Sequence, residues 1–186
     1  MADFHHFIKS LPHKFKPPEE ALLKRAFEFA QKAHHGQKRK SGKDYFEHSK
    51  NAGLILGQIF PDPPTLAATL MHDIPEDTSV PLEKIKEEFG AEIANLIDGV
   101  TQLGHVRMKS SHDKFYVENL RKLFLATSRD VRVILIKLAD RLHNMRTIQF
   151  IAPEKQAKVA QETLEIYAPI AGRLGIGAWK DELEDL

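Results

Sequence analysis

Cysteine is absent from this sequence of 186 residues. Disulfide bonds, thiolate metal sites and cysteine nucleophiles are therefore excluded, and His, Asp and Glu remain as the possible metal ligands. Long apolar runs are also missing, because no stretch approaches the roughly 20 residues that a helix needs to cross a bilayer. The opening segment, MADFHHFIKSLPHKF, lacks the continuous apolar stretch of a signal peptide. Together these absences predict a soluble, cytoplasmic protein with no membrane partner.

An excess of charge of either sign is missing as well. The 27 Lys and Arg residues are balanced by 26 Asp and Glu residues, which leaves a net charge of +1. Such a chain has no overall basic field for nonspecific nucleic-acid binding, and its aromatic residues are not interleaved with a basic stripe. A nucleic-acid partner is therefore not expected, and any anion site must be local.

Apolar residues recur at helical spacing along most of the chain, which predicts an all-α fold. The fragment VRVILI could form a strand, but helical spacing continues through the KLADRLHNM that follows it. We expect Pro169 to kink or stop the last helix. We expect an N-terminal extension over residues 1–18 and one domain over residues 19–186. The predicted helices cover residues 19–34, 47–60, a segment from about Pro64 through His72 and Asp73, 81–90, 91–104, 114–128, 130–148 and 153–175.

The stretch MHDIPEDT crowds ionisable groups at the end of an apolar run. On a helix, residues four apart share a face, so Glu76 would lie above His72 and Asp77 above Asp73. Pro75 removes one backbone donor, so the helix is expected to kink or end there. A helix end at this point would let the two acids lean over a metal ion held by the preceding pair.

Two adjacent residues seldom complete a metal shell, so distant ligands are required, and His48 and Asp140 are the candidates. Asp140 lies between Leu138 and Leu142 in a strongly apolar helix, and a buried carboxylate needs a partner. A salt bridge with a neighbouring Lys or Arg would satisfy it equally well. If all four residues bind one ion, two imidazoles and two carboxylates suit Mn²⁺, Fe²⁺ or Zn²⁺ better than Ca²⁺.

Several segments resemble the HD-domain phosphohydrolases, and specifically the hydrolase domain of the RelA/SpoT homologue family of guanosine tetraphosphate enzymes. Together they cover about residues 20 to 186 in the family's order. The segments are AHHGQKRKSGKDYFEH, MHDIPEDT, EEFGAEIANLIDGVTQLG, ENLRKLFLATSRDVRVILIKLADRLHNMRT and ETLEIYAPIAGRLGI with the later ELEDL. The resemblance implies a compact multi-helix HD-domain fold, which agrees with the all-α prediction.

The resemblance also implies a role for each matching position. The metal ligands, usually for Mn²⁺, would be His48, His72, Asp73 and Asp140. The catalytic acidic pair would be Glu76 and Asp77. The positions that match nucleotide contacts are Arg39, Lys40, Ser41, Asn144 and Thr147. From charge patterning alone, the basic residues among them could equally form a solvated loop.

The sequence departs from the family pattern at Ser49, Lys50, Pro75 and Gly172, and none of these changes removes a matched ligand or acid. The resemblance therefore implies a hydrolase that removes the 3′-pyrophosphate of guanosine tetra- or pentaphosphate. Two alternatives stay open, namely an HD-domain enzyme acting on other phosphorylated nucleotides and a non-catalytic domain that senses the alarmone. Two-enzyme relatives continue from ELEDL into a synthetase domain, so we expect either a free-standing hydrolase or an excised domain.

Overall fold

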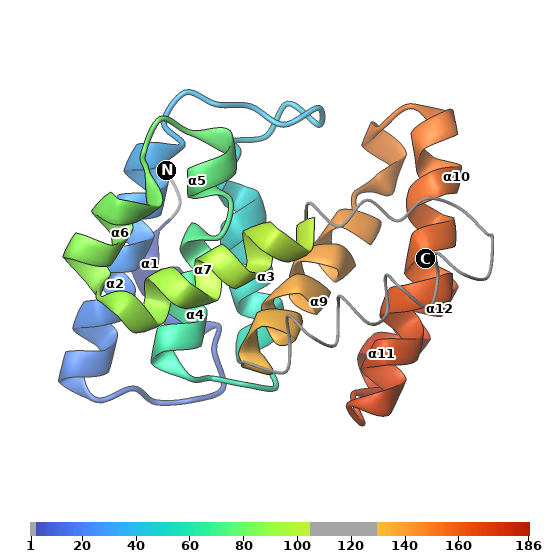
Figure 1. Cartoon of the computed structure of the whole chain (residues 1–186). Coiled ribbons are helices and arrows are strands. Elements are labelled where there is room, and N and C mark those ends of the chain that lie inside the picture. The colour runs from blue at the N-terminus through green and yellow to red at the C-terminus, as the bar shows by residue number, and fades with distance from the viewer. Residues whose placement is uncertain (1–2, 105–129) are drawn as a thin grey trace.

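The computed structural model describes residues 3–104 and 130–186, and within these ranges it contains helices, an isolated bridge between Lys38 and Asp44, and no β-strand (Figure 1). The all-α prediction is therefore confirmed. The helix predicted over residues 114–128 lies outside the described residues. None of the described helices combines the length and apolarity needed to cross a bilayer. The helices are α1 (Phe4–Lys9), α2 (Pro17–Ala33), α3 (Phe46–Gly57), α4 (Pro63–Met71), α5 (Ile74–Asp77), α6 (Leu82–Phe89), α7 (Ala91–Gly104), α9 (Arg132–Met145), η1 (Ile148–Phe150), α10 (Pro153–Glu162), η2 (Thr163–Tyr167), α11 (Ala168–Arg173) and α12 (Gly177–Asp185).

Helix α4 forms the centre of the core. Every residue from Thr65 to Met71 is buried, and the helix packs against α2, α3, α7 and α9. A helix that is apolar on all sides must be surrounded by other elements, and in Figure 1 these helices enclose it. The side chain of Asp62 caps its first turn by accepting a hydrogen bond from the Thr65 amide at 3.1 Å. The C-terminal end of α4 is thereby held at the middle of the molecule.

The N-terminal helix α1 packs on the same core. Phe7 is 1% exposed, and its ring lies 5.5 Å from that of Phe27 in α2. Helix α2 begins at Pro17, where two prolines suit the first helical turn because the amides there have no partner within the helix. The boundary at residue 18 stays a prediction, and the residues before it contribute buried apolar surface.

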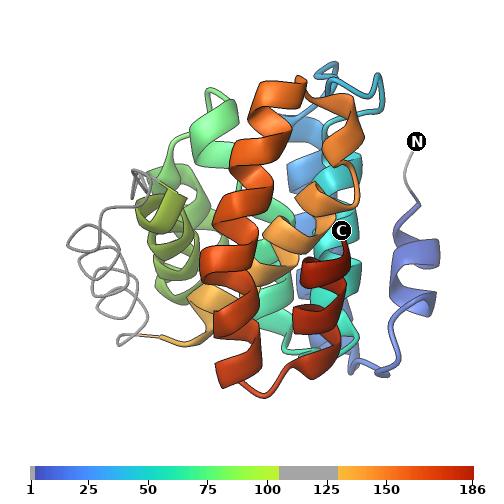
Figure 2. The ribbon, with the colours of Figure 1, turned by 90° about the vertical axis from the view of Figure 1, so that its right-hand side faces the viewer.

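The C-terminal helices change type at the proline that was expected to interrupt them. Helix α10 continues into η2, a π-helix, and then into α11, whose first turn contains Pro169. Figure 2 shows the three running in one line with α12 beside them. Pro169 cannot donate to the carbonyl of Glu165 and would clash with it in an α-helix. The wider π turn before the proline accommodates this without ending the helical path.

Candidate metal centre and adjoining pocket

The HD dipeptide lies in a turn between two helices. The prediction that the third helix would carry His72 and Asp73 is wrong, because α4 ends at Met71 and α5 begins at Ile74. Pro75 explains the break, since it has no amide to donate to the Met71 carbonyl and lies instead in the first turn of α5. The Asp77 amide then donates to the Asp73 carbonyl at 2.9 Å, which returns the chain to helical geometry.

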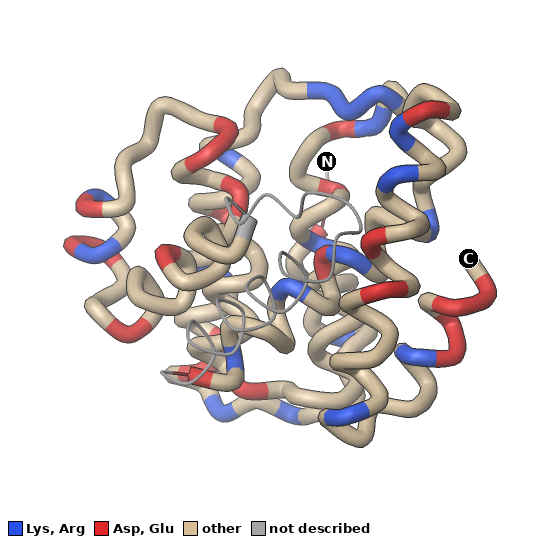
Figure 3. Tube along the Cα trace, turned by 45° about the vertical axis from the view of Figure 1, so that its right-hand side comes forward, with Lys and Arg blue, Asp and Glu red and all other residues tan. Residues whose placement is uncertain are grey.

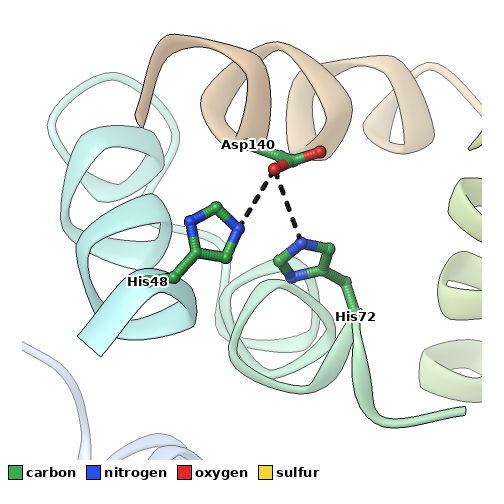
Figure 4. A group of neighbouring side chains, drawn as sticks. All are labelled: His48, His72 and Asp140. Carbon is green, nitrogen blue, oxygen red and sulfur yellow. Dashed lines mark ion pairs between the residues drawn. The ribbon is translucent and has the colours of Figure 1, made fainter. Parts of the chain in front are cut away.

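The structure brings the four predicted metal ligands together. Nitrogen and oxygen atoms of His48, His72 and Asp140, which come from α3, the end of α4 and α9, lie within 4.8 Å of one another (Figure 4). His48 Nε2 lies 3.1 Å from Asp140 Oδ1 and 3.5 Å from Asp73 Oδ2. His72 Nε2 lies 3.0 Å from Asp73 Oδ1 and 3.9 Å from Asp140 Oδ1. His48, His72 and Asp140 therefore form one group of candidate ligands, and Asp73 lies at its edge, where it contacts the two histidines through different carboxylate oxygens.

His72 is oriented so that its free nitrogen faces the carboxylates. Its Nδ1 donates to the Thr69 carbonyl at 2.8 Å, and its buried Nε2 has no hydrogen-bond partner among the described residues. Burial disfavours the charged ring, but the carboxylates of Asp73 and Asp140 outweigh burial and raise the pKa of His72 to about 10. The geometry thus calls for a positive charge at Nε2, which either a proton or a metal ion can supply. A divalent ion fits this donor set.

Asp140 has partners on both carboxylate oxygens. Its Oδ1 accepts from Asn144 Nδ2 at 2.6 Å and faces His48, while its Oδ2 accepts from Lys137 Nζ at 2.8 Å. Burial opposes ionisation, but Lys137 and the histidines hold the pKa of Asp140 well below its usual value. From the sequence, a salt bridge and metal coordination were alternative explanations for a buried Asp140. In the structure its Oδ2 forms the salt bridge with Lys137, while its Oδ1 faces His48.

A third histidine touches the metal-ligand group. His143 Nδ1 lies 2.6 Å from His48 Nδ1, and the two ring centroids are 4.8 Å apart. Burial and the neighbouring His48 lower the pKa of His143 to about 3, so its ring is neutral around pH 7. His143 comes from α9, one turn from Asp140.

The predicted acidic pair lies on the exposed helix α5, and a tyrosine connects it to the ligands. The hydroxyl of Tyr45 donates to Asp77 Oδ2 at 2.6 Å and lies 3.4 Å from Asp73 Oδ2. Burial, together with these carboxylates, raises the pKa of Tyr45 above its ordinary value and keeps the hydroxyl protonated. Glu76 is exposed next to Asp77, and its carboxylate has no hydrogen bond or ion pair within the described parts of the chain.

A pocket of about 520 Å³ adjoins the candidate metal centre, with His48 and Asp140 in its wall. Its volume lies within the range typical of small-molecule sites. The loop between α2 and α3 contributes a run of basic residues, which Figure 3 shows as a blue segment at one end of the molecule. All five residues that match nucleotide contacts line it, namely Arg39, Lys40, Ser41, Asn144 and Thr147.

The basic loop is tied to the rest of the site. The Arg39 side chain donates to Asn144 Oδ1 at 3.0 Å, and its guanidinium lies 5.4 Å from the centroid of the Tyr45 ring. Asn144 uses its other end to donate to Asp140, so one amide joins the loop to a candidate ligand. Gly42 has a φ of +79°, a conformation that permits the tight turn of this loop. A purely solvated loop would not make these contacts.

Three residues of the site were not identified from the sequence, namely Tyr45, Lys137 and His143. Lys137 had a local signal, because residues three apart on a helix are neighbours. His143 had the same local signal, because it lies three residues after Asp140. The contact of His143 with His48, 95 residues away, had no such signal, and neither had that of Tyr45 with Asp77, 32 residues away.

Comparisons with known proteins agree with this arrangement. The model of the HD domain matches residues 26–177. The chain is 48% identical over 177 residues to the guanosine-3′,5′-bis(diphosphate) 3′-pyrophosphohydrolase of Aquifex aeolicus, covering 95% of this chain and 25% of that protein. It is 47% identical over 171 residues to the GTP pyrophosphokinase of Myxococcus xanthus, covering 91% of this chain and 23% of that protein. The chain thus spans about a quarter of the length of these relatives.

A solved structure shares the fold. It is described as a metazoan ortholog of SpoT that hydrolyzes ppGpp, and it matches with a TM-score of 0.62 and 23% sequence identity. The match covers 93% of this chain and 87% of that one. The predicted resemblance to RelA/SpoT homologues is confirmed by these relatives, and the match across residues 26–177 shows that the chain belongs to the HD-domain family.

Proposed function

We propose that this chain is a metal-dependent guanosine 3′,5′-bis(diphosphate) 3′-pyrophosphohydrolase. The observation that carries the proposal is the group formed by His48, His72 and Asp140, with Asp73 at its edge, beside a basic pocket whose wall contains His48 and Asp140. The Aquifex aeolicus relative bears this name over a protein four times as long, while the Myxococcus xanthus relative is named a GTP pyrophosphokinase. The retained ligand set of this segment favours hydrolysis.

Mn²⁺ is the proposed ion, and Fe²⁺ or Zn²⁺ would fit the same two nitrogens and two oxygens. When bound, a divalent ion polarises a phosphoryl oxygen and lowers the pKa of its water. Two of the candidate ligands are oriented by hydrogen bonds within the protein, because the Thr69 carbonyl accepts from His72 and Lys137 donates to Asp140. Such partners typically matter for affinity almost as much as the ligands do.

The pocket supplies what a doubly pyrophosphorylated guanosine requires. Arg39 and Lys40 would face its base and phosphates, since guanidinium groups stack on planar rings and both cations attract phosphate. Ser41, Asn144 and Thr147 add hydroxyl and amide groups that can form hydrogen bonds with the nucleotide. The pocket reaches the candidate ligands His48 and Asp140, so a substrate bound there would bring its 3′ end to them.

The reaction adds water to the phosphorus attached to the 3′-oxygen. The bond between that phosphorus and the 3′-oxygen breaks, the oxygen takes up a proton, and GDP or GTP leaves with pyrophosphate. Glu76 would take the proton from the attacking water, because it is exposed beside the ligand group and its carboxylate has no competing partner in the described structure. Asp77, held by Tyr45, would orient that water.

Pyrophosphate release from guanosine tetraphosphate, followed with and without Mn²⁺, tests the proposal. Glu76→Gln should lower kcat by about 10²- to 10⁴-fold while it leaves Mn²⁺ binding intact. Asp73→Asn should weaken Mn²⁺ binding and turnover together. Glu87→Gln, which changes an exposed acid on α6, is the matched control and should behave as wild type.

Two outcomes would contradict the proposal. Mn²⁺-dependent cleavage of an adenosine analogue in preference to the guanosine compound would indicate an HD-domain enzyme for other nucleotides. Tight binding of guanosine tetraphosphate without pyrophosphate release in excess Mn²⁺ would indicate a sensing domain.

A further inference from the structure

The contact between His48 and His143 joins two like atoms. Both are Nδ1 nitrogens, and they lie 2.6 Å apart. Two ring nitrogens approach this closely only when one carries a hydrogen and the other offers a lone pair. The contact therefore admits two arrangements, which differ in the ring that donates.

The surroundings of His48 select one of these arrangements. Its Nε2 faces Asp140 Oδ1 at 3.1 Å and Asp73 Oδ2 at 3.5 Å, so this is the nitrogen that can coordinate an ion. A coordinating nitrogen must offer its lone pair, which places the proton of a neutral His48 on Nδ1. His48 must then donate, and His143 must accept through a bare Nδ1.

We propose that His143 is a positioning residue, which fixes the tautomer and ring orientation of His48 by accepting its Nδ1 hydrogen. The inference rests on the proposed metal site and deepens it. The remaining proton of His143 then lies on its Nε2, on a ring that lines the nucleotide pocket. His48 in α3 is thereby held by a residue of α9, the helix that also supplies Asp140.

An acceptor role for His143 and a mere packing role predict different results for two substitutions of similar shape. Asparagine and leucine have nearly the same shape, but only asparagine presents an oxygen close to the position of the histidine Nδ1. His143→Leu should weaken Mn²⁺ binding by about 10- to 100-fold, as is typical when the partner of a metal-bound histidine is lost. His143→Asn should restore most of that affinity. His5→Leu, which removes an exposed histidine on α1, is the control and should bind Mn²⁺ as wild type does.

Mn²⁺ affinity is measured by titrating MnCl₂ into the metal-free protein and following the free ion by electron paramagnetic resonance. A second readout uses unmutated protein loaded with diamagnetic Zn²⁺, in which long-range ¹H–¹⁵N correlation spectra report which nitrogen of each histidine is protonated. We expect hydrogen on Nδ1 of His48 and on Nε2 of His143. This second readout does not depend on the folding of any variant.

Three outcomes would overturn the inference. Hydrogen on Nδ1 of His143 would mean that it donates to His48, and equal Mn²⁺ affinities of the Leu and wild-type proteins would mean that the contact does not position the ligand. Equal affinities would leave the proposed metal site standing, whereas hydrogen on Nδ1 of His143 would place the hydrogen of His48 on Nε2 and would also remove His48 as a ligand through that atom. Failure of the wild-type protein to bind either ion would overturn the metal site itself, and the inference with it.

Discussion

Removal of the Tyr45 hydroxyl tests how the acidic pair is held. In Tyr45→Phe the ring remains, so its stacking on His34, with centroids 4.8 Å apart and an interplanar angle of 17°, should persist. What is lost is the 2.6 Å hydrogen bond to Asp77 Oδ2, together with the longer contact of 3.4 Å to Asp73 Oδ2. A hydrogen bond to a charged group contributes about 1.5–3 kcal/mol.

If that energy holds Asp77 in its working position, kcat should fall by about 10- to 100-fold, since about 1.4 kcal/mol corresponds to a factor of ten. KM should change little, because the aromatic face that lies beside Arg39 is retained. The assay is steady-state pyrophosphate release from guanosine tetraphosphate at saturating Mn²⁺.

A double-mutant cycle with Asp77→Asn separates this role of Tyr45 from a general loss of structure. Because the hydroxyl acts through Asp77, the double variant should be no slower than Asp77→Asn alone. An unchanged kcat in Tyr45→Phe would refute the reasoning. The reasoning would also be refuted if the loss of kcat in the double variant equalled the product of the losses in the two single variants.

Three further predictions concern stability. Mn²⁺ at about 100 times its Kd should stabilise the fold by about 2.7 kcal/mol, and the resulting rise in Tm of about 5–10 °C should be absent in Asp73→Asn, as measured by differential scanning fluorimetry. Phe7→Ala should lower the free energy of unfolding by about 3–5 kcal/mol in urea titrations, and a change below about 1 kcal/mol would mean that α1 contributes little to the core. The hydrogen bonds from Arg132 lower the pKa of Asp130, so its contribution is present above the unfolded pKa and is lost as the pH falls through the folded one. Asp130→Asn should therefore cost up to about 1 kcal/mol at pH 7, with a difference in stability from wild type that narrows as the pH falls below the unfolded pKa of Asp130; a constant difference would contradict this.

Helices with one apolar face could be predicted well from the sequence. The stripe of α2 and the long stripe of α9 are set by local spacing, and the structure places α2 at Pro17–Ala33 and α9 at Arg132–Met145. The end of α4 was harder to predict, because buried residues continue beyond its last residue, at His72 and Ile74. The break follows from one missing amide, that of Pro75, whose effect appears four residues earlier in the chain.

The site, like the helices, could be predicted only in part from the sequence. The four candidate ligands and the acidic pair could be named from motifs, yet their meeting point depends on the packing of α3 and α4 against α9, which no local pattern encodes. The contacts of Tyr45 with Asp77 and of His143 with His48 are long-range pairs of ordinary side chains. Such pairs become visible only when the helices are placed relative to one another.

The placement of the candidate ligands on separate helices has a consequence for synthesis of the protein. His48, His72 and Asp73 leave the ribosome long before Asp140, which lies in α9. A nascent chain that ends before α9 can offer at most three of the four groups. In the proposed function, the set of candidate ligands is therefore complete only once α9 has docked, and capture of the ion would follow that step.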